Sequence, residues 1–412
     1  MPDNKNILLI SYYFPPLGMG GVKRPYALFK YLPEFGYDVT VVTVKNICYP
    51  EYDYSRMESI SEDLIHRTGS TDPSRIMYLL GIKRHKNSGA KSKLQSRFFF
   101  PDSKRGWNKF ALRKAKRIIK KKKISTILTT SPPLSTHLIG MELKEKYDIP
   151  WIADFRDFWF SLPIEKAYMY ENQVSAANRI KNQIVNMADE IVSVNNCIKN
   201  YLGRGQVIMN GAEIGNIDVN SKNNDTFVIG VLGTINYLCP IEPLFRAVAS
   251  LIKNATSIKD KINIVHVGNI DQESKDLVNK YNLRDVVELH GYLPVKQALE
   301  TIYKSDVLYL AVNQFDNYHI LPSRIFDYLV SGLSILGVVS PDSDAALLLK
   351  EHPKGKVVGP EAIDEISEHI LNLYEQRNDL KKHRSVSEEL RNKYSTRAMA
   401  EKYSKLLDRL IP

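Results

Sequence analysis

The segment Leu321-Pro322-Ser323-Arg324-Ile325-Phe326-Asp327-Tyr328-Leu329-Val330-Ser331-Gly332 carries the most informative pattern in this chain of 412 residues. A proline, a hydroxyl and a guanidinium stand at the expected start of a helix, where free backbone N–H groups attract anions and an Arg can bind phosphate oxygens. Asp327 follows Ser323 by one turn, so its carboxylate can reach the same side of the helix and accept hydrogen bonds from ribose hydroxyls. The pattern predicts either a nucleotide diphosphate site built on Ser323, Arg324 and Asp327, or an ordinary capped helix of an α/β fold.

Outward from this segment, apolar runs of strand length alternate with amphipathic stretches along the whole chain, which is typical of parallel sheets with crossover helices. A polar run ending in Asn220-Ser221-Lys222-Asn223-Asn224-Asp225 separates two similar halves. We therefore predict a first domain at 1–205 with an insertion at about 47–105, a linker at 206–225, a second domain at 226–394, and a terminal helix in 395–412. The expected strands are Ile7–Ser11, Val39–Val44, Ile127–Thr130, Trp151–Phe155, Ile191–Val194, Val207–Met209, Val228–Leu232, Ile262–Val267, Val287–Leu289, Val307–Ala311 and Ile335–Val339.

The composition excludes several classes of protein. No apolar run approaches the ~20 residues that span a bilayer, and the first residues lead into a short strand rather than a signal peptide. The cysteines Cys48, Cys197 and Cys239 lack the spacing of a metal site or a disulfide framework. We therefore expect a cytoplasmic protein with no metal, whose cysteines have packing roles.

The net charge of +11 is concentrated in one window. Between Lys83 and Lys123 there are 17 Lys and Arg and a single acidic residue, Asp102. The predicted helix Trp107–Lys123 ends this window with Lys120, Lys121, Lys122 and Lys123. Its basic face fits a solvated surface, a nucleic-acid patch or a patch for anionic lipid headgroups. Because no nucleic-acid-binding motif is found, we expect no nucleic-acid partner and favour peripheral attachment to the inner face of a membrane.

Three strand ends in the first half carry candidate site residues. Gly18, Gly20 and Gly21, followed by Arg24, form either a ligand-contacting loop or a plain connection. Asp154, Arg156 and Asp157 follow a strand at the edge where α/β sheets bind ligands, and they fit either sugar recognition or an ion-pair network. Ser131 and His137 flank a third strand end. They lack the third member of a nucleophilic triad, so His137 is interpreted as a residue of the cleft floor or as a packed side chain.

Two strand ends in the second half complete the pattern. Gly233 and Thr234 follow a strand and face the predicted phosphate site. Tyr292 and Leu293 follow a later strand, where a nucleotide base could lie against the chain. The order and spacing of these signals carry more information than any one of them.

Taken together, these motifs resemble those of retaining glycosyltransferases of family 4. The resemblance covers nearly the whole chain, and its strongest element is the 322–332 segment, which matches the family form PSK-x-x-EYLA-x-G. The other matching stretches are Tyr13-Phe14-Pro15-Pro16 with Gly20-Gly21 and Arg24, Phe100-Pro101-Asp102 with Gly106-Trp107, Pro150-Trp151-Ile152-Ala153-Asp154-Phe155-Arg156-Asp157, Ala188-Asp189, Asn210-Gly211 and His290-Gly291-Tyr292.

The resemblance implies a GT-B fold, in which two Rossmann-like domains with doubly wound parallel sheets face a central cleft. It implies transfer of a sugar from a nucleotide diphosphate sugar to a surface-polysaccharide or lipid-linked glycan acceptor, with retention and without cofactor or metal. Arg324, Asp157 and His137 are then the candidate catalytic residues. The donor-binding set is Gly20, Gly21, Gly233, Thr234, Tyr292, Leu293, Ser323, Arg324 and Asp327, and the acceptor-side set is Arg24, Asp154, Arg156 and Ser131.

Three departures from the family pattern leave alternatives open. Asn236-Tyr237-Leu238-Cys239-Pro240 supplies no charge where family members often carry an Arg and a Lys-Gly pair. His319 stands where the family has the first Glu of its E-x7-E pair, and Thr130-Ser131 stands where many members have a His. A sugar-nucleotide epimerase of the same fold and a non-catalytic glycan- or membrane-binding partner of another transferase therefore remain as alternative functions.

Overall fold

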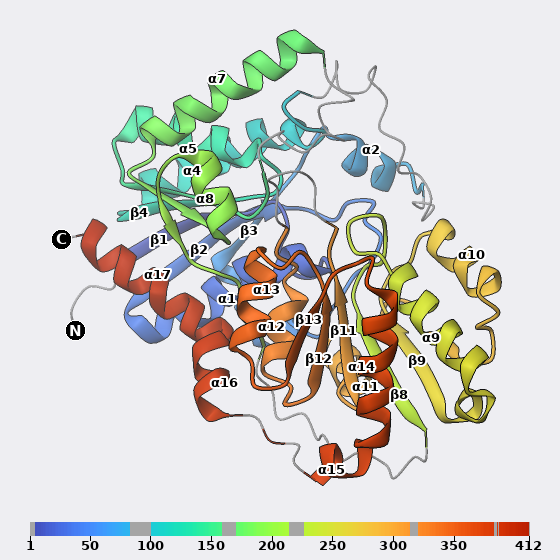
Figure 1. Ribbon diagram of the computed structural model, residues 1–412. Coiled ribbons are helices and arrows are strands. Elements are labelled where there is room, and N and C mark those ends of the chain that lie inside the picture. The colour runs from blue at the N-terminus through green and yellow to red at the C-terminus, as the bar shows by residue number, and fades with distance from the viewer. Residues whose placement is uncertain are drawn as a thin grey trace. The chain divides into compact units, whose positions relative to one another are not determined.

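The computed structural model describes residues 5–82, 100–158, 170–213, 226–313, 320–382, 385 and 387–411 (Figure 1). Contacts divide the chain into two compact units. Unit 1 comprises Met1–Asn210 and Thr396–Pro412, and unit 2 comprises Gly211–Ser395. Of the segments given predicted roles, 83–99 in the insertion, 214–225 in the linker and His319 lie outside the described residues.

Unit 1 is built on a 7-stranded parallel sheet with the strand order β3-β2-β1-β4-β5-β6-β7. Its strands are β1 Lys5–Ile10, β2 Tyr37–Val44, β3 Ile65–Thr68, β4 Thr126–Ser131, β5 Trp151–Phe155, β6 Glu190–Ser193 and β7 Gln206–Val207. Its α-helices are α1 Lys23–Tyr31, α2 Pro73–Leu79, α4 Asn108–Lys121, α5 Thr136–Tyr147, α7 Glu171–Met187, α8 Asn196–Leu202 and α17 Thr396–Leu410. Short 3-10 helices occupy Gly20–Val22, Leu32–Phe35, Met57–Ser59, Glu62–Leu64 and Arg105–Trp107.

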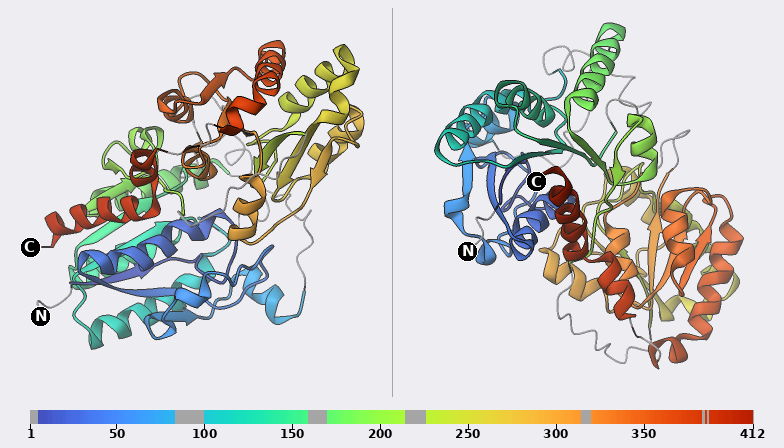
Figure 2. Two further views of the ribbon diagram at one scale, coloured as in Figure 1. Left: turned by 90° about the horizontal axis from the view of Figure 1, so that it is seen from below. Right: turned by 90° about the vertical axis from the view of Figure 1, so that its left-hand side faces the viewer.

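Helices cover both faces of this sheet because its strands are apolar on both sides. On one face, Ile152 of β5 belongs to a core that includes Leu28 of α1 and Leu407 of α17. On the other face, Trp151 packs so closely on α5 that a Cβ at Gly140 would lie 2.3 Å from its ring nitrogen. The last helix of the chain thus packs beside the first, as Figure 2 shows for α17 and α1.

Unit 2 is built on a 6-stranded parallel sheet with the strand order β10-β9-β8-β11-β12-β13. Its strands are β8 Phe227–Leu232, β9 Ile262–Val267, β10 Val287–Leu289, β11 Val307–Ala311, β12 Ser334–Val338 and β13 Gly355–Val358. Its helices are α9 Glu242–Asn254, the 3-10 helix Thr256–Lys261, α10 Gln272–Lys280, α11 Val295–Ile302, α12 Arg324–Leu329, α13 Asp344–Glu351, α14 Ile363–Glu375, α15 Arg377–Lys382 and α16 Glu388–Tyr394.

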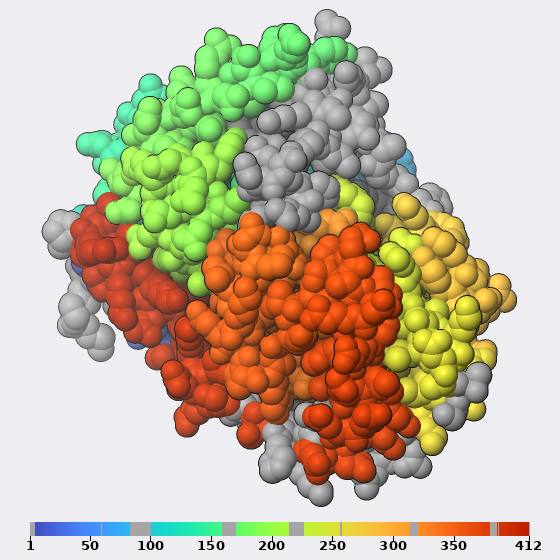
Figure 3. Space-filling model, viewed as in Figure 1, coloured from blue at the N-terminus to red at the C-terminus, as the bar shows by residue number. Residues whose placement is uncertain are grey.

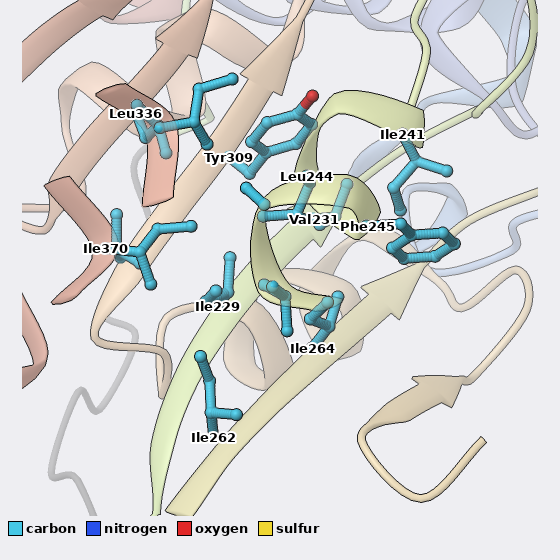
Figure 4. Packing of buried hydrophobic residues seen from close by; sticks show 14 of the residues in the cluster. Ile229, Val231, Ile241, Leu244, Phe245, Ile262, Ile264, Tyr309, Leu336 and Ile370 are labelled. Atoms are coloured by element: carbon cyan, nitrogen blue, oxygen red, sulfur yellow. The ribbon is translucent and has the colours of Figure 1, made fainter. Parts of the chain in front are cut away.

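The core of unit 2 lies between the sheet and the helices α9 and α14. Ile229 of β8 and Ile264 of β9 pack with Leu244 and Phe245 of α9 (Figure 4). Ile370 of α14 joins the same cluster, and the opposite side of α14 forms part of the surface seen in Figure 3. This packing fixes the carboxyl ends of β8, β9 and β11 relative to one another.

The predicted fold class is confirmed, and each predicted strand is present. The strand expected at Val207–Met209 is shorter and begins earlier, at Gln206–Val207. Two further strands, β3 and β13, were not predicted; they lie at sheet edges, where half-polar sequences such as Ile65-His66-Arg67-Thr68 are stable. The helix expected to open at Pro322 begins at Arg324.

The motif Phe100-Pro101-Asp102 with Gly106-Trp107 has a structural role in the insertion. The Asp102 carboxylate accepts a 2.7 Å hydrogen bond from the Ser135 backbone just before α5. A Cβ at Gly106 would lie 2.8 Å from the Asp72 nitrogen, so only glycine fits there. The indole of Trp107 donates a 2.7 Å bond to Thr68. The motif therefore ties the insertion to β3 and α5.

Candidate functional site

The short helix α12 presents two side chains to the end of β8. Arg324 and Tyr328 are four residues apart and share one face of the helix. The apolar residues of the helix, Ile325, Phe326 and Leu329, are fully buried and anchor it in unit 2. Ser323 is the N-cap residue, yet its side chain forms no capping hydrogen bond. The local sequence thus builds a rigid platform beside the predicted phosphate site.

Arg324 holds the loop that follows β8. Its two terminal nitrogens donate to the carbonyl oxygens of Leu232 and Thr234, the second at 2.8 Å. Gly233 lies between them with φ +91°, and a Cβ there would come within 3.3 Å of the guanidinium. Among the described residues, no carboxylate forms an ion pair with Arg324. Its positive charge is therefore not balanced by a carboxylate of the described residues.

His266 and Tyr328 were missed as site residues by the sequence analysis. The Nε2 of His266, on β9, donates to the Gly233 carbonyl at 2.8 Å, and burial lowers the pKa of this imidazole to about 4. The Tyr328 hydroxyl accepts a 2.8 Å bond from the Leu232 backbone, and burial raises its pKa to about 12. A histidine within an apolar strand, and a tyrosine four residues after Arg324, were the signals that could have revealed them.

The remaining donor-side residues of unit 2 gather at the same sheet edge. Gly268, after β9, approaches the β8 loop so closely that a Cβ would lie 2.2 Å from the Gly233 oxygen. The Gly268 N–H donates to the Gly291 carbonyl at 2.7 Å, so the segment after β10 lies beside the segment after β9. Tyr292 and Leu293 follow Gly291, and both are half-buried. Asp327 is 7% exposed on α12, and its carbonyl accepts a 2.7 Å bond from Tyr303.

In unit 1, Arg24 and Asp154 form a buried ion pair. Arg24 on α1 is 2% exposed and binds both carboxylate oxygens of Asp154, each at 2.9 Å. The same guanidinium donates to the Tyr403 hydroxyl at 2.7 Å and to the Asn210 side chain at 3.2 Å. Burial alone would raise the pKa of Asp154, but the charge and hydrogen bonds of Arg24, together with Thr130, lower it. Arg24 and Asp154 could contact a sugar acceptor directly only if this ion pair opened. Their role on the acceptor side therefore stays a prediction.

Arg156 joins three loops at the carboxyl edge of the unit 1 sheet. It donates to the carbonyl oxygens of Ser131, Pro132 and Gly21. Ser131 itself is buried, and its hydroxyl faces the Asp154 carbonyl at 3.4 Å. Asp157 is exposed directly after β5. Gly20, in the glycine loop, is exposed as well. Among the described candidates at this edge, Asp157 and Gly20 are therefore the exposed ones.

His137 is packed under this edge. Its Nδ1 lies 2.8 Å from the Thr129 hydroxyl, and its ring lies 4.3 Å from that of Phe155. Burial lowers its pKa to about 3. No hydrogen bond joins His137 to Ser131 within the described part of the chain. This arrangement agrees with the packed interpretation of His137, and its catalytic role stays a prediction.

Helix α4 carries the basic face. It buries Ala111, Ala115 and Ile118 and has no acidic residue. Its exposed basic residues are Lys109, Arg113, Arg117, Lys120 and Lys121, followed by half-buried Lys122 and exposed Lys123. No helix in the described ranges is both long and apolar enough to cross a bilayer. The same residues contain no cluster of His, Cys, Asp and Glu suited to a metal ion.

Solved structures show what the architecture resembles. No protein-family model and no curated protein sequence matches this chain. A sucrose-phosphate synthase from Thermosynechococcus elongatus aligns with a TM-score of 0.65 at 15% identity, over 98% of this chain and 99% of that one. The alignment with Anabaena HepE in complex with UDP and glucose has a TM-score of 0.63 at 12% identity, over 98% and 99%.

A third structure, an α,α-trehalose-phosphate synthase (UDP-forming) from Burkholderia xenovorans in complex with glucose-6-phosphate, aligns with a TM-score of 0.64. The two sequences are 10% identical, and the alignment covers 98% of this chain and 100% of that one. The chain has the GT-B fold. At these identities, the likeness establishes the architecture alone.

Proposed function

We propose that this protein is a retaining glycosyltransferase of family 4 that needs no metal. It transfers a sugar from a nucleotide diphosphate sugar to a surface-polysaccharide or lipid-linked glycan acceptor. The observation that carries the proposal is the guanidinium of Arg324, which is fixed at the end of β8 without a carboxylate partner among the described residues. The complexes of HepE with UDP and glucose, and of other GT-B structures with UDP compounds, support a nucleotide-sugar donor.

The chemistry of the donor requires such a charge. When the glycosidic bond to the diphosphate breaks, negative charge builds up on the leaving oxygen. A guanidinium that is already held in place stabilises this charge without a reorganisation cost at the moment of reaction. Arg324 meets this condition because the carbonyls of Leu232 and Thr234 fix its orientation. In this proposal, Ser323 and Thr234 line the diphosphate, Asp327 binds the ribose, and Tyr292 and Leu293 lie beside the base.

The proposal places the protein in the cytoplasm, attached peripherally to the inner face of a membrane. The exposed basic face of α4 would attract anionic headgroups, at roughly 1 kcal/mol for each Lys or Arg near the surface. Helix α2 and the residues after it add apolar contact, because Leu79 and Leu80 are 65% and 68% exposed and Ile76, Tyr78 and Ile82 are exposed as well. An apolar element followed by basic sequence suits an interfacial site, so a lipid-linked acceptor is favoured.

The direct test incubates the purified protein with nucleotide sugars and a membrane extract that contains lipid-linked glycans. Transfer of label from one donor to the lipid fraction, together with release of nucleoside diphosphate, supports the proposal. Conversion of the donor with no acceptor present would instead identify an epimerase. Binding of a nucleoside diphosphate without hydrolysis or transfer would favour a non-catalytic partner of another transferase.

A further inference from the structure

We propose that His266 is a positioning residue for the donor site: it locks the Gly233–Thr234 peptide so that the Thr234 N–H faces the donor diphosphate. The inference rests on the proposed function for the identity of the ligand. The orientation of the peptide itself rests on the hydrogen bonds around the β8 loop.

In a trans peptide, the C=O and the following N–H point in opposite directions. The Gly233–Thr234 bond is trans. The Gly233 oxygen accepts from the buried Nε2 of His266 at 2.8 Å. The Thr234 N–H lies in the same plane but on the opposite side of the C–N bond, so it points away from His266. Gly233, with φ +91°, occupies a backbone region that other residues rarely adopt.

The neighbouring amides already have partners. The Gly233 N–H donates to the carbonyl oxygen of Val267 at 2.7 Å. The Ile235 N–H donates to the carbonyl oxygen of Asn269 at 2.8 Å, and the Asn236 N–H donates to that of Cys239 at 3.4 Å. Within the described residues, the Thr234 N–H has no such backbone bond. Among the four backbone amides Gly233–Asn236, the Thr234 N–H is therefore the donor without a backbone partner in the described part of the chain. Arg324 lies beside it, with its bond to the Thr234 carbonyl.

The lock requires a neutral imidazole in one tautomer. Because Nε2 donates to a carbonyl, Nδ1 carries no proton in the neutral ring. Nδ1 is buried and has no hydrogen-bond partner among the described residues, so a proton there would be unsatisfied by them. Burial keeps the pKa at about 4, and the ring stays neutral at physiological pH. His266 thus acts through the peptide and not through its own charge.

The fixed Thr234 N–H could compensate for the lack of a positive charge in the loop that follows β8. The segment Asn236-Tyr237-Leu238-Cys239-Pro240 offers no cation to the diphosphate. A fixed backbone N–H is a neutral donor that can bind a phosphate oxygen, and such charge-assisted bonds are stronger than neutral ones. The Thr234 amide and Arg324 would together replace the cations that the family carries at this loop.

The test compares His266→Leu with His266→Gln, whose amide nitrogen can reach nearly the same position as Nε2. His369→Leu is the control, since His369 is a half-buried histidine of unit 2 that lies on α14. Binding is measured for whichever of UDP, GDP and ADP the parent binds, and for the corresponding nucleoside. We expect His266→Leu to weaken diphosphate binding about 10- to 100-fold with little change for the nucleoside. His266→Gln should restore most of the affinity, and His369→Leu should leave it unchanged.

An equal loss for diphosphate and nucleoside, or no loss at all, would overturn the inference. Crystal structures of the ligand-free parent and of His266→Leu separate this outcome from failure of the proposed function. The Gly233 oxygen should face His266 in the parent and turn away in the variant. If the parent binds none of the three nucleoside diphosphates, the proposed function fails, and the crystal structures still decide whether His266 sets the peptide. An unchanged peptide in the variant would refute the lock.

Discussion

Arg24 in unit 1 and Arg324 in unit 2 occupy comparable positions, each beside strand ends of a parallel sheet. Arg24 is buried, and its charge is balanced by both oxygens of Asp154. Arg324 is half-buried and is held by two carbonyl oxygens, which leave its formal charge in place. One arginine thus forms a closed ion pair, and the other has no carboxylate partner among the described residues.

The difference shows how to separate structural arginines from ligand-binding ones. A buried guanidinium paired with a carboxylate contributes to the fold, and removal of one partner leaves the other charge stranded in the interior. A guanidinium oriented by neutral carbonyls is rigid, yet it still attracts an anion. The experiments below test this distinction, from the largest expected effect to the smallest.

Replacing Arg24 should cause the largest loss. Arg24→Met keeps the aliphatic stem but leaves Asp154 buried without its partner, so the free energy of unfolding should fall by about 3–5 kcal/mol. Denaturant unfolding measures the change. The matched control is Arg397→Met, because Arg397 forms an exposed ion pair with Glu34. The Arg397 side chain is 55% exposed and the Glu34 side chain is 44% exposed. That variant should lose at most about 1 kcal/mol.

The pH dependence of the same variant gives a sign test. In the parent, the pKa of Asp154 is lowered, so its stabilising contribution is complete above about pH 4 and is lost as the pH falls through the folded-state value. Without Arg24, burial raises this pKa above that of the unfolded chain, and stability is then lost as the pH rises. The gap between parent and variant should therefore narrow from pH 7 towards pH 4. A gap of constant size would contradict the ion-pair account.

Arg324→Ala should act on catalysis more than on stability. If this guanidinium stabilises the leaving diphosphate, as proposed, its loss should lower turnover by about 100-fold or more. The control Arg246→Ala removes an exposed arginine of unit 2, paired with Glu361 at 3.8 Å, and should leave turnover unchanged. Steady-state kinetics with the active donor measure both variants. Equal turnover of the parent and of Arg324→Ala would show that Arg324 does not contribute to the reaction.

Asp327→Ala should chiefly weaken donor binding. If its carboxylate accepts hydrogen bonds from the ribose, the loss should be roughly 1–3 kcal/mol in binding free energy. Asp327→Asn keeps the shape and an acceptor oxygen, so its loss should be smaller. Titration calorimetry with the donor gives the affinities, and unfolding curves show whether each variant is folded. Affinity that stays at the parent value in both folded variants would exclude the ribose contact.

The basic face of α4 should give the smallest effect per side chain, about 1 kcal/mol for each lysine that reaches anionic headgroups. Replacing Lys120, Lys121, Lys122 and Lys123 with Gln should reduce co-sedimentation with anionic vesicles and leave donor binding unchanged. The control changes Lys275, Lys280, Lys296 and Lys304, four exposed lysines of unit 2, to Gln. Binding of the parent should fade with salt as the Debye length falls from about 10 Å at 0.1 M. Equal loss in both quadruple variants would indicate a general charge effect.

The sequence was sufficient to predict the strands whose apolar composition indicates that they are buried. Apolar runs such as Ile262–Val267 became central strands, and the edge strand Gly355–Val358 was missed because a glycine and a lysine interrupt its apolar pattern. Candidate site residues were recognisable at strand ends because glycine, charge and aromatic residues collect there. The side chains and backbone groups that they contact could not be recognised from the sequence. Tyr403 binds Arg24 from 379 positions away, and His266 meets Gly233 only through the pairing of β8 and β9. Such contacts depend on tertiary packing, which local patterns do not encode.

The most direct test of the central claim is a thermal-unfolding screen of the purified protein against nucleotide sugars, with parent and Arg324→Ala side by side. Ligand binding to the folded state stabilises it by about 2.7 kcal/mol at 100 times Kd. We predict that one nucleotide sugar, and its nucleoside diphosphate, raise the unfolding temperature of the parent and have a much smaller effect on Arg324→Ala. Failure of every nucleotide sugar to stabilise the parent, or equal stabilisation of both proteins, would contradict the account.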